Sequence, residues 1–227
     1  MPDPGLMIFA AGLGTRMGAL TADRPKPLIA VAGKPLIDHA LALADGAGLA
    51  RPVVNLHYRG GMLRAHLAGR DIRFSEESDM LLDTGGGLRA ALPLLPPGPV
   101  LTLNSDAVWT GANPLSALIA AFDPARMDAL LALVPRDRAA GHAGAGDFAL
   151  SGDGRLSRGG AFVYTGAQIV DPAGLAEIPD RVFSLNRLWD AAAARGRLFG
   201  LVHPGGWADV GRPEGIAAAE AMLEAAT

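Results

Sequence analysis

Short apolar runs alternate along the chain with longer segments in which apolar residues recur every three or four positions. The first run, Leu6–Ala10, ends at a glycine-rich turn, which is typical of a buried parallel strand. The segment that follows Pro35 has helical spacing, and Gly48 ends it. By the same criteria we predict strands at Pro52–Leu56, Ile72–Ser75, Val100–Leu103 and Ala129–Val134, and helices at Met62–Leu67, Gly87–Leu92 and Ala117–Phe122.

The pattern changes after Pro135. Residues 135–170 are rich in glycine and contain short strand-like runs at Asp147–Leu150 and Ala161–Tyr164. These runs indicate antiparallel strands added to the sheet, or a small lid, over about residues 135–165. The chain then returns to the earlier pattern, with a helix at Leu185–Ala194, a strand at Leu198–Val202 and a helix at Pro213–Ala226 that has Ile216, Ala219 and Leu223 on one face.

Repeated strand–helix units predict a mostly parallel sheet with helices on both faces. The chain has 227 residues, of which 50% are hydrophobic and 19% charged, so it can bury the core of one α/β domain. No internal repeat or low-complexity linker divides it. We therefore expect residues 1–227 to form a single domain of the α/β class.

Composition excludes several classes of function. The chain has no cysteine, which rules out disulfides, zinc–thiolate sites and thiol catalysis. Its net charge of −3 argues against a broad surface for nucleic acid. No apolar run reaches the about 18 residues of a membrane span, and Leu6–Ala11 is too short for a signal peptide. We expect a cytoplasmic protein that binds neither nucleic acid nor membrane.

The turn after the first predicted strand, AAGLGTRMG at residues 10–18, has the glycine spacing of a phosphate-binding loop. A dinucleotide-binding loop needs a third glycine, where this chain has Met17, and the P-loop motif is absent. Two cations, Arg16 and Lys26, lie close to the turn in sequence, and prolines on both sides hold Lys26 in an extended segment. These features together favour a triphosphate site over an ordinary turn.

Two aspartates are candidate metal ligands. Asp106 follows the predicted strand Val100–Leu103, and Asp209 follows a short strand-like stretch near the C-terminus. Ligands of open α/β sheets bind beyond the carboxyl ends of the strands, where two carboxylates, water and phosphate oxygens can complete the shell of Mg²⁺. From position alone, capping a helix or a turn is the more common role of an aspartate at the end of a strand.

Residues 8–28, IFAAGLGTRMGALTADRPKPL, resemble the signature of the sugar-1-phosphate nucleotidylyltransferases, in which an apolar strand precedes A-A-G-x-G-[TE]-R-[ML] and P-K-P-L. The resemblance extends over essentially the whole chain. It is strongest to the short bacterial N-acetylmuramate-1-phosphate uridylyltransferase group, which combines T-G-G-G, G-D-F and W-x-D-V-G. The matching elements here are Thr84–Gly87, Gly146–Phe148 and Trp207–Gly211.

The resemblance implies a GT-A-like, Rossmann-related domain of three layers that transfers a nucleotidyl group to a sugar 1-phosphate with release of pyrophosphate. It implies Arg16 and Lys26 as catalytic residues and Mg²⁺ as the cofactor, held by Asp106 and Asp209. Ser105 stands where closer relatives often have glycine. The implied nucleotide-binding residues are Ala11, Gly12, Gly14, Thr15, Gly85 and Gly86, and the candidate sugar-binding residues are Asn55, Asp147, Thr165 and Gly166.

The preferred substrates are UTP and N-acetylmuramic acid 1-phosphate, in cell-wall recycling, with the enzyme a monomer or homodimer. Other members of the same enzyme class are alternatives: a mannose- or heptose-1-phosphate guanylyltransferase, or a phosphocholine cytidylyltransferase. A catalytically silent nucleotide-sugar sensor is the alternative from a different class. Such a sensor is expected to lack one of the four charged residues, Arg16, Lys26, Asp106 and Asp209, all of which are present.

Overall fold

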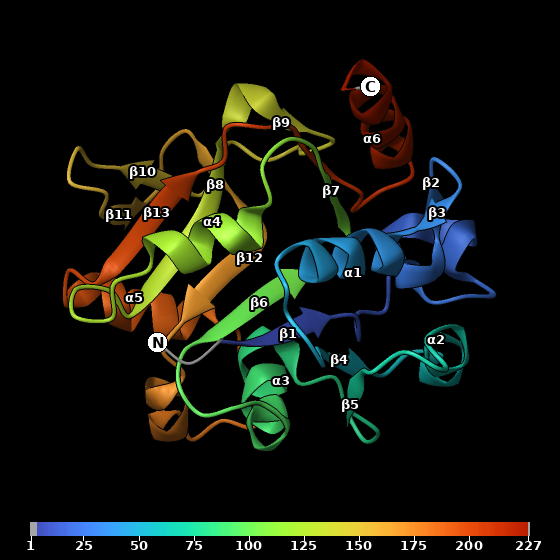
Figure 1. Ribbon diagram of the computed structural model, residues 1–227, viewed down its shortest axis with the longest axis horizontal. Coiled ribbons are helices and arrows are strands. Elements are labelled where there is room, and N and C mark those ends of the chain that lie inside the picture. The colour runs from blue at the N-terminus through green and yellow to red at the C-terminus, as the bar shows by residue number, and fades with distance from the viewer. Residues whose placement is uncertain (1–3, 227) are drawn as a thin grey trace.

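A central sheet of nine strands organises residues 4–226, which the computed structural model describes. β1 (Gly5–Phe9) lies between β4 (Val53–Leu56) and β6 (Val100–Asn104), and β5 (Arg73–Glu76) pairs with β4. All four strands run parallel. Their carboxyl ends therefore lie along one edge of the sheet (Figure 1).

Beyond β6 the sheet becomes mixed. β12 (Phe162–Val170) pairs antiparallel with β6 and β8 (Ala129–Pro135), and β13 (Leu198–Val202) runs parallel to β8. The antiparallel pair of β10 (Phe148–Leu150) and β11 (Leu156–Arg158) extends the sheet from the start of β12. These strands are antiparallel additions to the sheet, one of the two alternatives that the sequence leaves open for about residues 135–165.

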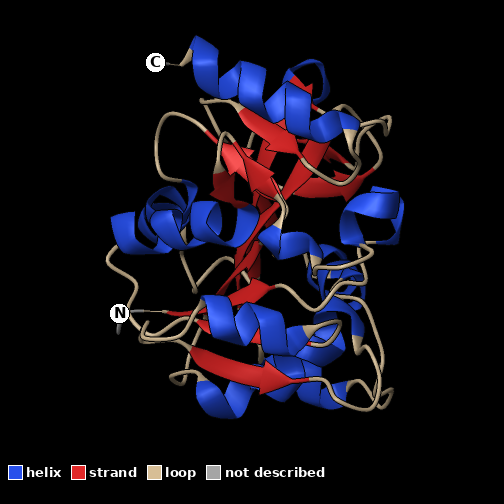
Figure 2. Cartoon of the chain, turned by 90° about the vertical axis from the view of Figure 1, so that its right-hand side faces the viewer, coloured by secondary structure: helices blue, strands red, loops and turns tan. Residues whose placement is uncertain are grey.

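Helices cover both faces of the sheet, as Figure 2 shows. Leu6 and Ile8 of β1 face one group of helices and Met7 faces the other, and each of the three side chains is at most 2% exposed. This alternation is what a strand buried on both faces requires. The first group comprises α1 (Leu36–Gly46), α2 (Gly60–His66) and α4 (Pro114–Ala121), and the second comprises α3 (Asp83–Ala91) and α5 (Asn186–Ala194). The predicted α/β fold class is thus confirmed.

Two small sheets flank the central one. β7 (Ala107–Trp109) pairs antiparallel with β14 (Trp207–Asp209), which runs parallel to β9 (Ala139–Ala140). β2 (Ala30–Val31) and β3 (Lys34–Pro35) form a hairpin. The C-terminal helix α6 (Glu214–Ala225) packs its predicted apolar face, Ile216, Ala219 and Leu223, into the core next to β14 and β2.

Two elements depart most from the boundaries that the sequence predicts. The helix expected at Gly87–Leu92 begins at Asp83, so the glycine run lies inside α3. The strand expected at Ala161–Tyr164 continues to Val170 as β12, across a register shift between Tyr164 and Gln168. Both errors arise at glycines, which punctuate the sequence pattern even where tertiary packing continues the element. None of the helices within residues 4–226 has both the length and the apolar character needed to cross a membrane.

Candidate active site

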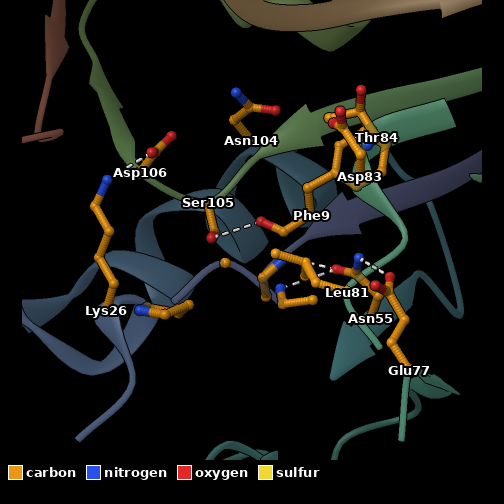
Figure 3. Close-up of a pocket in the computed structure, with 14 residues that line it drawn as sticks. Phe9, Lys26, Asn55, Glu77, Leu81, Asp83, Thr84, Asn104, Ser105 and Asp106 are labelled. Carbon is orange, nitrogen blue, oxygen red and sulfur yellow. Dashed lines mark hydrogen bonds and ion pairs between the residues drawn. The ribbon is translucent and has the colours of Figure 1, made fainter. Parts of the chain in front are cut away.

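The carboxyl ends of the four parallel strands surround a cavity of about 210 Å³. The turn after β1 forms its floor, and the ends of β4, β5 and β6 and the start of α3 form its walls. Figure 3 shows Lys26 and Asp106 at one end of this cavity and Asn55 and Glu77 at the other. The lining residues are Phe9, Ala10, Ala11, Gly12, Lys26, Pro27, Asn55, Glu77, Leu81, Asp83, Thr84, Asn104, Ser105 and Asp106.

Lys26 and Asp106 form an ion pair at the charged end of the cavity. Lys26 Nζ donates to Asp106 Oδ2 at 2.6 Å, and the lysine residue is only 8% exposed. A short 3₁₀ turn, Lys26–Leu28, begins at the lysine, with Pro25 before it and Pro27 inside it. The prolines fix this part of the backbone, so the ammonium group is held at one place rather than carried on a mobile arm.

The small sheet brings Asp209 next to Asp106. Asp209 of β14 pairs with Ala107 of β7, and the N–H of Val210 donates to the carbonyl oxygen of Asp106 at 2.9 Å. Burial raises the pKa of Asp209, and the Asp106 carboxylate raises it further, while Lys26 and Arg16 oppose this effect. Within residues 4–226 no group donates a hydrogen bond to the Asp209 carboxylate. Two carboxylates that repel each other in a half-buried place are suited to share a cation.

The donor set fits a hard divalent cation such as Mg²⁺. The described residues contain no cluster of three or more His, Cys, Asp or Glu side chains that could enclose a metal ion. Mg²⁺ is usually held by one or two carboxylates and completes its octahedron with water and substrate phosphates. Asp106 and Asp209 are sufficient for that mode of binding.

The turn after β1 presents its backbone to the charged end of the cavity. A Cβ on Gly12 would meet no atom within 4 Å, so this glycine leaves open space on the cavity side. Gly14 has a φ of +66°, and a Cβ there would lie 2.9 Å from Thr21 Cγ2 and 3.0 Å from Lys26 Cβ. Glycine is therefore required at position 14 for both conformation and packing.

Thr15 and Arg16 are exposed at the start of the following 3₁₀ turn, Thr15–Thr21. Arg16 lies near enough to Asp209 to lower the pKa of that carboxyl group. The structure thus brings together four of the predicted residues, Arg16, Lys26, Asp106 and Asp209, from segments that are far apart in the sequence.

Asn55 lies against the turn after β1, at the end of the cavity opposite Lys26 (Figure 3). Its Oδ1 accepts hydrogen bonds from the N–H groups of Ala10, at 2.6 Å, and Ala11, at 3.2 Å. The Ala10 and Ala11 N–H groups are therefore already bonded to a protein acceptor. Asn55 is separated from the other candidate sugar-binding residues, which lie on or beside β12.

Glu77 is a buried acidic residue that the sequence reasoning missed. It follows β5 directly, is 2% exposed, and accepts a hydrogen bond from Asn55 Nδ2 at 2.7 Å. Glu77 is the second of two glutamates after a predicted strand, in FSEES, and such residues resemble solvated turn residues, so the sequence offers no clear signal for its burial.

The glycines of the T-G-G-G run act through packing, and they do not belong to the cavity lining. Thr84 lines the cavity, but the N–H groups of Gly85 and Gly86 donate to the carbonyl oxygen of Phe183. A Cβ on Gly85 would lie 2.4 Å from Phe183 Cε2, and one on Gly86 would lie 2.5 Å from the Arg181 oxygen. These glycines let the 181–183 segment lie directly against α3.

Two of the remaining sugar-site candidates have side chains that bond to the backbone. Asp147 Oδ2 accepts from the Tyr164 N–H at 2.8 Å, and Thr165 Oγ1 donates to the Ala132 oxygen at 2.6 Å. Gly166 adjoins the cavity wall, since a Cβ there would lie 2.7 Å from the Cβ of Asn104.

Asn104 and Ser105 were not predicted as site residues, although both follow the strand that carries Asp106. Ser105 Oγ donates to the Phe9 oxygen at 2.7 Å and ties the ends of β6 and β1 together. The serine that replaces the family's glycine is accommodated in this way. Asn104 lines the cavity next to Gly166.

Comparison with known proteins agrees with this geometry. The chain is 44% identical over 232 residues to the N-acetylmuramate alpha-1-phosphate uridylyltransferase of Caulobacter vibrioides, with 96% of each chain covered. It is 33% identical over 229 residues to the protein of the same name from Neisseria meningitidis serogroup B, which covers 96% of this chain and 98% of the relative.

In structure, the chain resembles HddC from Yersinia pseudotuberculosis, with a TM-score of 0.78, 20% identity, and coverage of 97% of this chain and 100% of that one. A likeness at this level of identity shows the shared fold. Residues 6–207 match the family described as the MobA-like NTP transferase domain. These matches confirm the predicted enzyme class, a sugar-1-phosphate nucleotidylyltransferase. The chain belongs to the family of MobA-like NTP transferases.

Proposed function

We propose that this protein transfers the uridylyl group of UTP to N-acetylmuramic acid 1-phosphate, which yields the UDP-sugar and pyrophosphate and serves cell-wall recycling. The observation that carries the proposal is the meeting of Lys26, Asp106 and Asp209 at the carboxyl edge of the sheet. The names of the two relatives above support the choice of uridylyl donor and muramic acid acceptor.

The chemistry requires positioning and charge neutralisation rather than a covalent intermediate. An oxygen of the sugar 1-phosphate attacks the α-phosphorus of UTP, the bond from that phosphorus to the bridging β-oxygen breaks, and pyrophosphate leaves. Lys26 contacts the α-phosphate and the attacking phosphate. Arg16 and the open turn at Gly12, with Gly14 and Thr15, hold the β- and γ-phosphates.

Asp106 and Asp209 hold Mg²⁺ in this proposal. When bound, the ion neutralises phosphate charge and draws the reacting groups into register. The ion pair between Lys26 and Asp106 already places a cation next to one carboxylate. Asp106 would therefore orient the ammonium group of Lys26 and, together with Asp209, would hold the metal.

The nucleoside occupies the end of the cavity away from Lys26, between the turn after β1 and the start of α3. Gly85 and Gly86 shape this end indirectly, by seating the 181–183 segment against α3. The sugar lies towards Asn104 and Gly166. The side chains of Asp147 and Thr165 act indirectly, through their hydrogen bonds to the backbone of Tyr164 and of Ala132. A reaction that consumes UTP belongs in the cytoplasm, and we propose that location.

The test is pyrophosphate release across four nucleoside triphosphates and a panel of acceptors, with Mg²⁺ and with EDTA. The panel contains N-acetylmuramic acid, N-acetylglucosamine, glucose and mannose 1-phosphates, and phosphocholine. We expect metal-dependent release with UTP and the muramic acid derivative. Release with a different nucleoside triphosphate or acceptor would change the proposed substrates but keep the mechanism. Nucleotide binding without any turnover would favour a catalytically silent sensor.

A further inference from the structure

A buried carboxylate stands behind the nucleoside end of the cavity without a cationic partner. Glu77 is 2% exposed, and no Lys, Arg or His forms a salt bridge with it in the described part of the chain. Its Oε1 accepts from Asn55 Nδ2 at 2.7 Å, and its Oε2 accepts from the Leu82 N–H at 2.8 Å. Both oxygens thus bond to protein groups.

Asn55 continues this chain of hydrogen bonds towards β1. Its amide nitrogen donates to Glu77, so its amide oxygen is free to accept from Ala10 and Ala11. The two side chains link the turn after β1, the end of β4 and the segment that leads into α3. Figure 3 shows these contacts beneath the cavity, on the side away from Lys26.

The sequence of donors and acceptors has a strict logic. The linkage begins at the backbone N–H groups of Ala10 and Ala11 and ends at the N–H of Leu82, so both of its ends are donors. One carboxylate and one amide satisfy this arrangement, because the amide donates to the carboxylate and each side chain keeps an oxygen for its own donor end. Two amides leave a donor facing a donor, whichever way each one is turned.

We propose that Asn55 and Glu77 are positioning residues that set the nucleoside end of the site. The proposal rests on the function proposed above. By drawing the Ala10 and Ala11 N–H groups inward, the pair fixes which atoms of the turn face the nucleotide. By holding Leu82, it also fixes the segment immediately before Asp83 and Thr84, which line the opposite wall.

The pair lies at the opposite end of the cavity from the phosphate-binding cations, so its effect should fall on the nucleoside. Loss of the hydrogen bonds made by Asn55 and Glu77 should weaken the binding of UMP and of UTP by a similar factor, since both nucleotides carry the same uridine. Loss of a phosphate contact should instead weaken UTP far more than UMP. The affinity for the sugar 1-phosphate should not change when the pair is altered.

The experiment compares Glu77→Gln with the double variant Asn55→Asp, Glu77→Gln. Glu77→Gln creates the donor–donor conflict and should raise KM for UTP and Kd for UMP by about tenfold or more. The double variant moves the carboxylate to position 55 and the amide to position 77. It restores every donor–acceptor pair, so it should return both constants to within about threefold of wild type.

A matched control is Thr102→Val, because Thr102 is fully buried on β6 and accepts a hydrogen bond from Gln168 Nε2 within the core. This variant should lower Tm without changing KM for UTP. Unchanged UTP and UMP constants in Glu77→Gln, or loss of sugar-phosphate affinity alone, would overturn the proposal. So would a double variant that folds but binds no better than Glu77→Gln.

If Glu77→Gln fails to fold, the double variant decides the question. A folded double variant with near-normal UMP binding supports the proposed role of the carboxylate–amide pair, whereas an unfolded double variant contradicts it. UMP binding by calorimetry requires no turnover. Wild-type protein that binds no uridine nucleotide would therefore count against the proposed function itself, separately from the role of the pair.

Discussion

At the scale of single residues, the account depends most on Lys26. The Lys26→Ala variant should lower kcat at least about a hundredfold, because a charge contact made in the transition state is lost. The fold should persist, and circular dichroism and Tm check it. Lys34→Ala is the matched control, since Lys34 lies on β3 outside the cavity lining. A Lys26→Ala enzyme with near-normal turnover would remove this lysine from the mechanism.

The carboxylates give a second prediction. Asp106→Asn and Asp209→Asn should each abolish the Mg²⁺-dependent activity, measured as the rate while the metal is titrated. Asp209→Asn should leave Tm of the metal-free protein unchanged or higher, because it removes a half-buried carboxylate that Asp106 repels. If either variant keeps the full metal response, that aspartate is a structural turn residue.

The sequence identifies residues of this kind only where they belong to a recognisable pattern. Lys26 lies between two prolines, and Asp106 and Asp209 end strand-like runs. Glu77 has no such mark, because the partner that explains its burial, Asn55, is 22 positions away. Side chains that bond across the fold cannot be paired from the sequence of one chain.

At the scale of elements, helix α3 carries the next prediction. Gly86→Ala should destabilise the fold by about 1–3 kcal/mol, because its Cβ would lie 2.5 Å from the Arg181 oxygen. Gly61→Ala is the control: it lies in α2, and a Cβ there meets no atom within 4 Å. That change should be neutral or stabilising by up to about 1 kcal/mol. Urea unfolding measures both, and equal stabilities for the two variants would contradict the packing role of Gly86.

The same helix shows where element boundaries escape prediction. Glycine has low helix propensity, so a run of three argues for a turn, yet contact with Phe183 makes the small residues necessary inside α3. Likewise, Gly166 has a φ of +86° where β12 changes register. In the sequence, a glycine at this position indicates the end of a strand. In both places tertiary contacts outweigh local preference.

At the scale of the whole molecule, the half-buried His39 and the buried His203 predict how stability responds to pH. Burial lowers the pKa of His39 and of His203 below the ordinary value of 6.5. The unfolded chain then binds more protons than the folded one as pH falls through about 6.5, so each neutral ring contributes stability that is lost towards acid.

Thermal unfolding between pH 7.5 and 5.5 checks this effect. We expect Tm to fall less in the double variant His39→Gln, His203→Gln than in wild type, and the difference between the two proteins isolates the two rings from the acidic groups. Both rings bond to backbone oxygens through Nε2, of Val31 and of Thr110, which glutamine can also reach. Parallel pH profiles for the two proteins would show that neither ring contributes.

The overall architecture is the part that the sequence predicts best. Repeated apolar runs and helical periods indicate a sheet between two helical layers, whatever the detailed topology. The strand order is less accessible, because β12 enters antiparallel between β6 and β8 from far along the chain. That arrangement places Gly166 beside Asn104 at the cavity wall, and no local sequence pattern predicts this contact.

The most direct test of the central claim is the product balance of the wild-type enzyme. UTP, N-acetylmuramic acid 1-phosphate and Mg²⁺ are incubated with the protein, and ³¹P NMR follows the phosphorus species. The account predicts equal amounts of UDP-N-acetylmuramic acid and pyrophosphate, with no reaction after chelation of the metal. Release of inorganic phosphate in place of pyrophosphate, or UDP-sugar formation at full rate in EDTA, would contradict it.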